Sequence, residues 1–192
     1  FARSVVSPLF GSRLSPKYAS LLELGPTLGG AFQLRRGMFM PWEIEDILGP
    51  RMAKDGLEEL ETLIGLSHTY SGVENDRVAL TLLEIEWYMK DRLLRDSDWA
   101  SMAHSIELRV PLVDSHLVQV VASRLASSEP FNKADLASAP RKPLPEKVLY
   151  KPKTGFCVPV REWLMGTEPN GKPETSLRQW ARLVYQSHTG NR

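Results

Sequence analysis

The chain has 192 residues, a formal net charge of +1 at pH 7 and a single cysteine, Cys157. This length is enough for one domain with its own core, while the near-neutral charge disfavours a dedicated nucleic-acid-binding protein. The lone cysteine excludes an internal disulfide, no apolar run approaches the ~18 residues of a membrane span, and no signal-peptide pattern follows Phe1, so we expect a cytoplasmic protein without membrane contact.

Helical patterns account for most of the first half of the chain. Caps, prolines and glycines predict helices over 15–24, 28–36, 40–48 and 51–64. Gly56 is expected to interrupt the last of these, and the polar, glycine-bearing segment 65–75 to form a connection. Asn75 or Asp76 is expected to cap the longest helix, which should reach about Leu94 because its apolar residues recur at steps of three and four.

The second half of the chain is expected to contain shorter helices. Asp98 is the predicted cap of a short helix, the Val110-Pro111 step forces extended backbone, and Asp114 caps a buried helix over 115–126. Prolines after 130 limit the chain to short helical turns. These turns are expected near 135, near 146 and over 161–165, followed by a link over 166–174 and a final amphipathic helix over 175–188. No strand pattern appears, so the predicted class is mainly α.

The segment 96–114, DSDWASMAHSIELRVPLVD, mixes charged and apolar residues more closely than ordinary core or surface segments do. Glu107 and Arg109 share one face in extended geometry, so we expect a structural ion pair that is buried beside its apolar neighbours. The segment resembles the synthetase domain of glutamine-hydrolysing asparagine synthetases, whose pattern is D-x-x-S-M-A-x-S-x-E-x-R-x-P-x-x-D. The matching residues are Asp98, Ser101, Met102, Ala103, Ser105, Glu107, Arg109, Pro111 and Asp114.

A second block, from Lys133 to Pro159, resembles the same family's K-x-x-L-R, L-P and R-x-K-x-G-F-x-x-P elements. Trp99, Leu112 and Ala137 stand where the family usually has arginine, phenylalanine and arginine. The family's nucleotide loops, S-G-G-x-D-S and S-G-x-G-x-D-E, are absent, as is its N-terminal cysteine nucleophile. The resemblance therefore implies a single-domain fragment, 1–192, forming the helical C-terminal portion of an adenine-nucleotide α-hydrolase-like (N-type ATP pyrophosphatase) α/β domain without its nucleotide-binding strands.

The resemblance also implies a reaction for the full-length parent. Aspartate and ATP would form an aspartyl-adenylate and pyrophosphate in the presence of Mg²⁺. Ammonia, supplied directly or by a glutaminase domain at the N-terminus of the same parent chain acting on glutamine, would then displace AMP and give asparagine. Without the phosphate-binding loops, we expect the fragment alone to be inactive and to bind no cofactor tightly.

A basic run from Lys133 to Lys153 holds the candidate site residues. Charge runs are usually solvated surface, but the resemblance implies that Lys133 is the catalytic cation and that Lys151 and Lys153 contact the phosphates or the substrate. It assigns a structural role to Asp98, Ser101, Met102, Glu107, Arg109 and Asp114. The four histidines lie far apart in sequence and no H-E-x-x-H motif occurs, so no protein-bound metal is expected.

Two alternatives remain open. The three departures leave room for a related amidotransferase, or an enzyme resembling β-lactam synthetases, that acts on another acid. A non-catalytic helical interaction module is the alternative from a different functional class.

Overall fold

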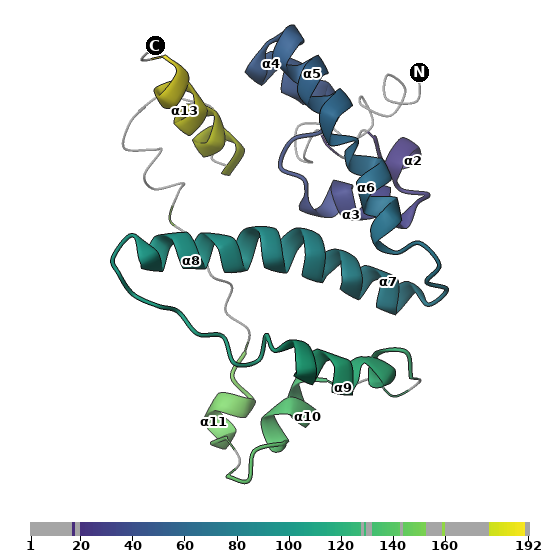
Figure 1. Cartoon of the computed structure of the whole chain (residues 1–192), viewed down its shortest axis with the longest axis vertical. Coiled ribbons are helices and arrows are strands. Elements are labelled where there is room, and N and C mark those ends of the chain that lie inside the picture. The colour runs from purple at the N-terminus through teal and green to yellow at the C-terminus, as the bar shows by residue number, and fades with distance from the viewer. Residues whose placement is uncertain are drawn as a thin grey trace. The chain divides into compact units, whose positions relative to one another are not determined.

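The computed structural model describes Lys17, residues 20–127, Glu129, 132–142, 144–152, Pro159 and 177–190. None of these residues lies in a strand, which confirms the mainly α class (Figure 1). The chain divides into two compact units, one comprising 1–22, 34–61 and 153–192 and the other 23–33 and 62–152. Within the described ranges, no helix is both long and apolar enough to cross a membrane.

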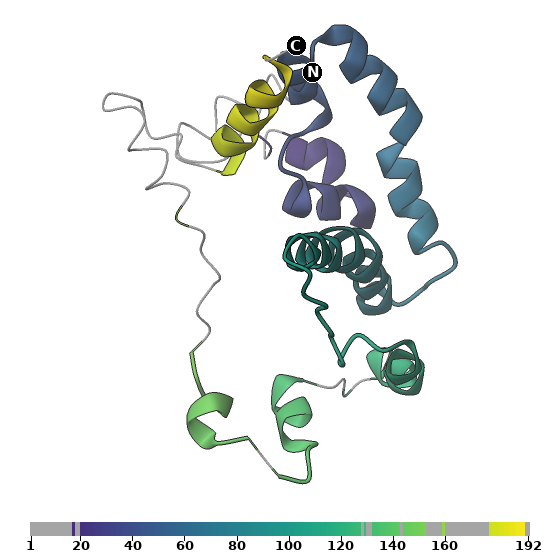
Figure 2. The same cartoon turned by 60° about the vertical axis from the view of Figure 1, so that its left-hand side comes forward.

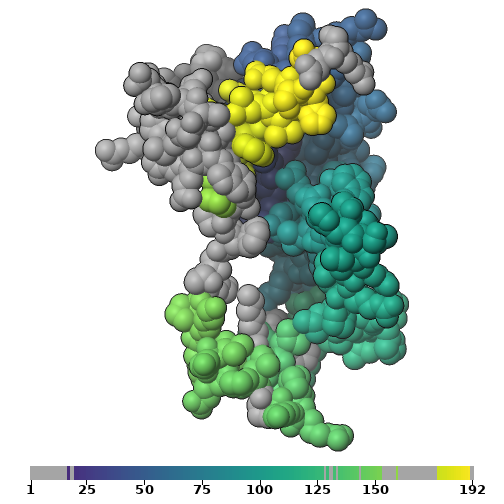
Figure 3. All heavy atoms as spheres, turned by 90° about the vertical axis from the view of Figure 1, so that its left-hand side faces the viewer, coloured from purple at the N-terminus to yellow at the C-terminus, as the bar shows by residue number. Residues whose placement is uncertain are grey.

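The first unit is built on α4 (Pro41–Leu48) and α5 (Pro50–Leu60), which pack against each other. Gly49 joins them with φ 82°, a conformation that favours glycine, and Pro50 then starts α5, where its missing N–H costs nothing. The C-terminal helix α13 (Leu177–Thr189) belongs to the same unit and lies beside α4 and α5 in Figure 3. The most buried apolar residues of the unit are Leu34, Met40 and Ala53.

The second unit contains the larger apolar cluster. Phe32 of α3 (Leu28–Arg36), Leu66 of α6 (Thr62–Thr69) and Leu83 of α7 (Asp76–Leu83) are buried together. They are flanked by Leu28, Tyr70, Trp87 and Tyr88. Two polar groups at the cluster's edge find partners: the Tyr70 hydroxyl accepts from Gly29 N–H at 3.3 Å, and Trp87 Nε1 donates to Thr69 Oγ1 at 2.9 Å. Burial and hydrogen bonding therefore hold α3, α6 and α7 together.

The long helix starts as predicted but ends later. Asn75 Oδ1 accepts hydrogen bonds from Arg77 N and Val78 N, at 3.0 and 3.2 Å, which confirms Asn75 as the cap. The helix then continues through η3 (Glu84–Leu94), a π-helical stretch, into α8 (Arg95–Met102). Figure 1 shows one uninterrupted spiral, which Figure 2 views nearly along its axis. The predicted end near Leu94 was wrong because no residue between it and Asp98 breaks a helix.

The break between the helices of the first half also differs from the prediction. Gly56 lies inside α5, and the chain turns instead at Glu61, whose φ is 39°. Segment 62–69, expected to be mostly connection, forms α6, and its Leu66 is buried in the core cluster. At the N-terminal end, α2 (Leu21–Leu24) stops before Gly25 as predicted.

The remaining predicted elements of the second half are present where the structure describes them. They are α9 (Ser115–Leu125), α10 (Lys133–Ser138) and α11 (Glu146–Leu149). The final helix, α13, also matches its predicted range. The helix start expected at Ser15-Pro16, the short helical piece expected over 161–165 and the link expected over 166–174 lie outside the described residues.

Candidate functional site

The turn after α8 places Ser105 of the motif in a left-handed backbone conformation. Ile106 N–H bonds to Ser101 O at 3.0 Å and Ser105 N–H to Met102 O at 2.9 Å, which together make a Schellman turn. Ser105 occupies the left-handed position with φ 58°, where glycine is the usual residue. The motif therefore fixes how the chain leaves the helix and enters its extended segment.

Asp98 does not cap a helix, in contrast to the prediction. It lies in the first turn of α8, which continues directly from η3, so the N–H groups ahead of it are already paired within the helix. Its carbonyl accepts a hydrogen bond from Ser101 Oγ at 3.1 Å. Met102 is exposed, as is Trp99, whose ring lies 5.1 Å from the Arg95 guanidinium carbon.

Glu107 and Arg109 form the expected ion pair, but the pair is not buried. Arg109 Nε donates to Glu107 Oε1 at 3.1 Å and Nη2 donates to Oε2 at 3.4 Å, a two-point contact. The side chains are 83% exposed for Arg109 and 71% for Glu107. Extended geometry does place both on one face, but the described parts of the chain do not cover that face. The expectation of a buried brace was therefore wrong.

Asp114 caps α9 as predicted, with Oδ1 accepting from Leu117 N–H at 2.8 Å. The helix itself was expected to be buried, but Leu117, Val118 and Val120 are all exposed. An apolar composition shows that a helix can be buried, but burial also needs partners that the described residues do not supply. The apolar side of α9 instead faces α10 across a groove of about 530 Å³, lined by Leu117, Val121, Leu125, Asn132, Asp135, Leu136 and Ala139.

Lys133 is the first residue of α10, and the residues around it define a complete N-terminal cap. Asn132 Oδ1 accepts from Ala134 N and Asp135 N at 2.7 and 3.2 Å, while Asp135 Oδ2 accepts from Asn132 N at 2.8 Å. This reciprocal capping box satisfies backbone donors at both ends of the turn. The Asp135 carboxylate is thus engaged with the backbone beside Lys133.

The basic segment is solvent-exposed wherever its side chains are described. Arg141, Lys142, Lys147 and Lys151 are exposed, and no ion pair is formed by any of these four with another described residue. Their charges are therefore available to an anion from solution. Lys153 lies outside the described residues, as does Cys157. No described hydrogen bond or ion pair joins the 98–114 motif to α10 or α11.

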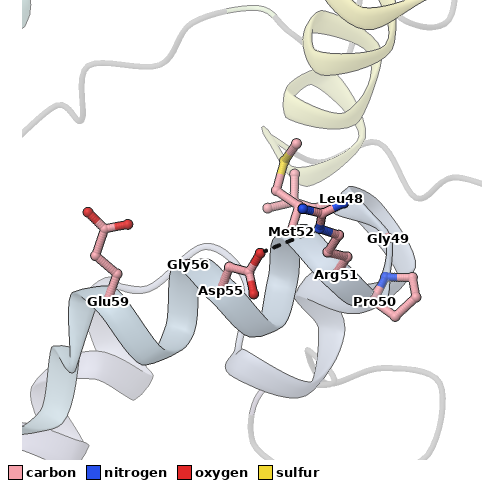
Figure 4. Close-up of a pocket in the computed structure, with 8 residues that line it drawn as sticks. All are labelled: Leu48, Gly49, Pro50, Arg51, Met52, Asp55, Gly56 and Glu59. Carbon is pink, nitrogen blue, oxygen red and sulfur yellow. Dashed lines mark ion pairs between the residues drawn. The ribbon is translucent and has the colours of Figure 1, made fainter.

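Another concave region lies where α4 meets α5 and encloses about 650 Å³ (Figure 4). Arg51 and Asp55 form its one drawn ion pair, at 3.9 Å, and their side chains are 96% and 66% exposed. It contains none of the predicted site residues. Across the described ranges, no group of three or more His, Cys, Asp or Glu side chains is placed to hold a metal ion.

Comparison with known proteins gives one consistent family. A family model described as asparagine synthase matches residues 17–182. Asparagine synthetase (glutamine-hydrolyzing) 1 of Bacillus subtilis is 30% identical over 121 residues, which is 62% of this chain and 18% of that protein. A Mycobacterium bovis protein provisionally named asparagine synthetase (glutamine-hydrolyzing) is 37% identical over 103 residues, covering 52% of this chain and 14% of that protein. No solved structure matches the chain.

Proposed function

The chain belongs to the asparagine synthase family, and from this we propose that it is the helical C-terminal part of the synthetase domain of an ATP-dependent, glutamine-hydrolysing asparagine synthetase. The observation that carries the proposal is the family match over 17–182, which includes the whole Asp98–Asp114 motif and the block that starts at Lys133. The similarity to relatives named as glutamine-hydrolyzing asparagine synthetases supports the carbon–nitrogen ligase chemistry. Those relatives are several times longer than the matched region, in keeping with a part of a larger enzyme.

The proposed reaction needs a cation where negative charge builds up. The aspartate side-chain carboxylate attacks the α-phosphorus of ATP, the bond to the β,γ-phosphates breaks, and pyrophosphate leaves. Ammonia then adds to the activated carbonyl and AMP is released. A positioned lysine stabilises the charge that gathers on the phosphate more in the transition state than in bound ATP, and so accelerates the first step.

We assign this cationic role to Lys133. Its place at the start of α10 is held by the capping box of Asn132 and Asp135, which gives it a defined backbone position. Lys151, exposed and outside any described ion pair, and Lys153 are proposed as weaker contacts to the phosphates or the substrate. Magnesium accompanies ATP in this reaction, but the described side chains do not fit a resident metal site.

Glutamine would supply ammonia through a glutaminase domain elsewhere in the same enzyme. The test is pyrophosphate and AMP formation by the complete enzyme with ATP, Mg²⁺ and ammonia, with and without aspartate. We expect product only when aspartate is present. If products form only with a different acid, that acid is the substrate in place of aspartate. If neither product forms with any acid, the non-catalytic interaction module is favoured.

A further inference from the structure

A cluster of cations lies where α13 meets the start of α4, within the first unit. Arg178 and Arg182 are one helical turn apart, so they share a face of α13. Both guanidinium carbons lie over the ring of Phe39, 4.8 and 5.6 Å from its centre. The ring orders the two guanidinium groups side by side through cation–π contact.

One carboxylate, that of Glu43, is shared between this cluster and the backbone. Glu43 Oε1 pairs with Arg178 Nη2, and Oε2 accepts a hydrogen bond from Met40 N–H at 2.9 Å. Both of its oxygens are thus engaged. Only 11% of the Glu43 side chain and 20% of the Arg178 side chain are exposed. A single buried carboxylate can neutralise one of the two arginines and leaves the other uncompensated.

Two guanidinium donors in the cluster are buried without an acceptor. Arg178 Nη1 and Arg182 Nε make no hydrogen bond to any described residue. A third cation lies close by: burial, and then the charge of Arg178, lower the pKa of the Lys17 ammonium, which donates to Arg35 O at 3.3 Å. Buried donors on charged groups are costly when unsatisfied, so the cluster combines excess positive charge with unmet hydrogen-bonding capacity.

We propose that Arg178 and Arg182 bind a small oxyanion of the phosphate class, with Lys17 adding to the positive potential. A guanidinium fork matches the oxygens of phosphate, and a charge-assisted hydrogen bond is stronger than one to a neutral acceptor. An oxyanion supplies both missing elements, namely acceptors for the two buried donors and negative charge for the arginine that Glu43 leaves uncompensated. A water molecule would supply only the first. The proposal rests on residues of the first unit alone and does not involve Lys133, which belongs to the second.

The proposal is tested by calorimetric titration of inorganic phosphate into the 192-residue chain at constant ionic strength. Three proteins are compared: the wild type, Arg182→Met, and the matched control Arg51→Met. Arg51 carries the same charge in the same unit but is 96% exposed and paired with Asp55. We expect saturable binding by the wild type, affinity about tenfold or more weaker in Arg182→Met, and no change in Arg51→Met.

Circular dichroism checks that each variant is folded. If Arg182→Met fails to fold, Lys17→Met replaces it, and the same direction of change is expected because Lys17 contributes charge to the site. Acetate titrated at the same ionic strength should bind more weakly than phosphate. The proposal is overturned if wild-type protein shows no saturable phosphate binding, if both arginine variants weaken it equally, or if acetate binds as tightly.

Discussion

Arg178 and Glu43 form a largely buried ion pair although 135 positions separate them in the sequence. Removing one partner of a buried pair leaves the other charge without compensation, so we expect Glu43→Ala to lower the free energy of unfolding by roughly 3–5 kcal/mol. The same substitution also removes the acceptor for Met40 N–H at the start of α4. Denaturant unfolding measures the change, and a loss below about 1 kcal/mol would show that the pair is not buried in solution.

Glu107→Ala provides the matched comparison. Its pair with Arg109 is bidentate but exposed, and exposed ion pairs contribute roughly 0–1 kcal/mol. We therefore expect an unfolding midpoint close to that of the wild type. A large destabilisation would mean that the Glu107 side chain is covered in solution, and would restore the buried brace expected from the sequence.

Gly30 has a steric requirement that can be tested against another helical glycine. A Cβ at Gly30 would lie 2.1 Å from Leu24 O, which is backbone and cannot swing away. Gly30→Ala should destabilise the chain by roughly 1–3 kcal/mol, the usual cost of overpacking. Gly56→Ala, in the middle of α5 with nothing within 4 Å, should instead stabilise it by about 0.5–1 kcal/mol. Thermal melts that give both variants the same sign would contradict this account.

Ser105 carries a backbone cost that glycine would relieve. Its φ of 58° is left-handed, which costs a non-glycine residue roughly 1 kcal/mol. Ser105→Gly should raise stability by up to about that amount, while Ala100→Gly, inside α8, should lower it by about 1 kcal/mol. If Ser105→Gly is destabilising, the serine side chain has a role that the turn geometry does not explain.

The lowered pKa of Lys17 predicts that the stability of the chain depends on pH. Burial and the nearby Arg178 lower the pKa of Lys17 in the folded chain below its ordinary value, so the unfolded chain binds more protons between the two pKa values. Stability contributed by this group should therefore rise as pH increases through that window toward 10.5. In Lys17→Met this part of the rise should disappear. Urea midpoints of both proteins across this pH range measure it, and parallel curves would rule out the effect.

Sequence patterns located most helices because the signals that start and stop them are local. Asn75 and Asp114 are caps whose side chains bond to N–H groups two or three residues away, so both could be predicted. The turn at Glu61 could not, because neither glycine nor proline marks it in the sequence. Local propensity favoured a break at Gly56, and tertiary packing overrode it.

The candidate site was predictable to the extent that it follows a family motif. The pairing of Glu107 with Arg109 could be predicted, because alternating residues of an extended segment share one face. The exposure of the pair could not, because it depends on which other parts of the protein cover this face. The cluster of Phe39, Glu43, Arg178 and Arg182 was missed altogether. No local pattern connects residues so far apart. The only hint was a pair of arginines spaced by four in the last helix.

The most direct test of the proposed function is aspartate-dependent pyrophosphate release by the complete synthetase, with ammonia supplied so that the glutaminase is bypassed. Lys133→Ala should lower this rate by roughly 10²–10³, the usual effect of removing a group that stabilises transition-state charge. Lys133→Arg should restore little, because a planar fork does not replace a point charge. Lys147→Ala changes an exposed lysine of the same basic segment, at a position that none of the family's sequence elements specifies, and should leave the rate nearly unchanged. Near wild-type release by Lys133→Ala would contradict the assignment and make Lys151 or Lys153 the better candidate.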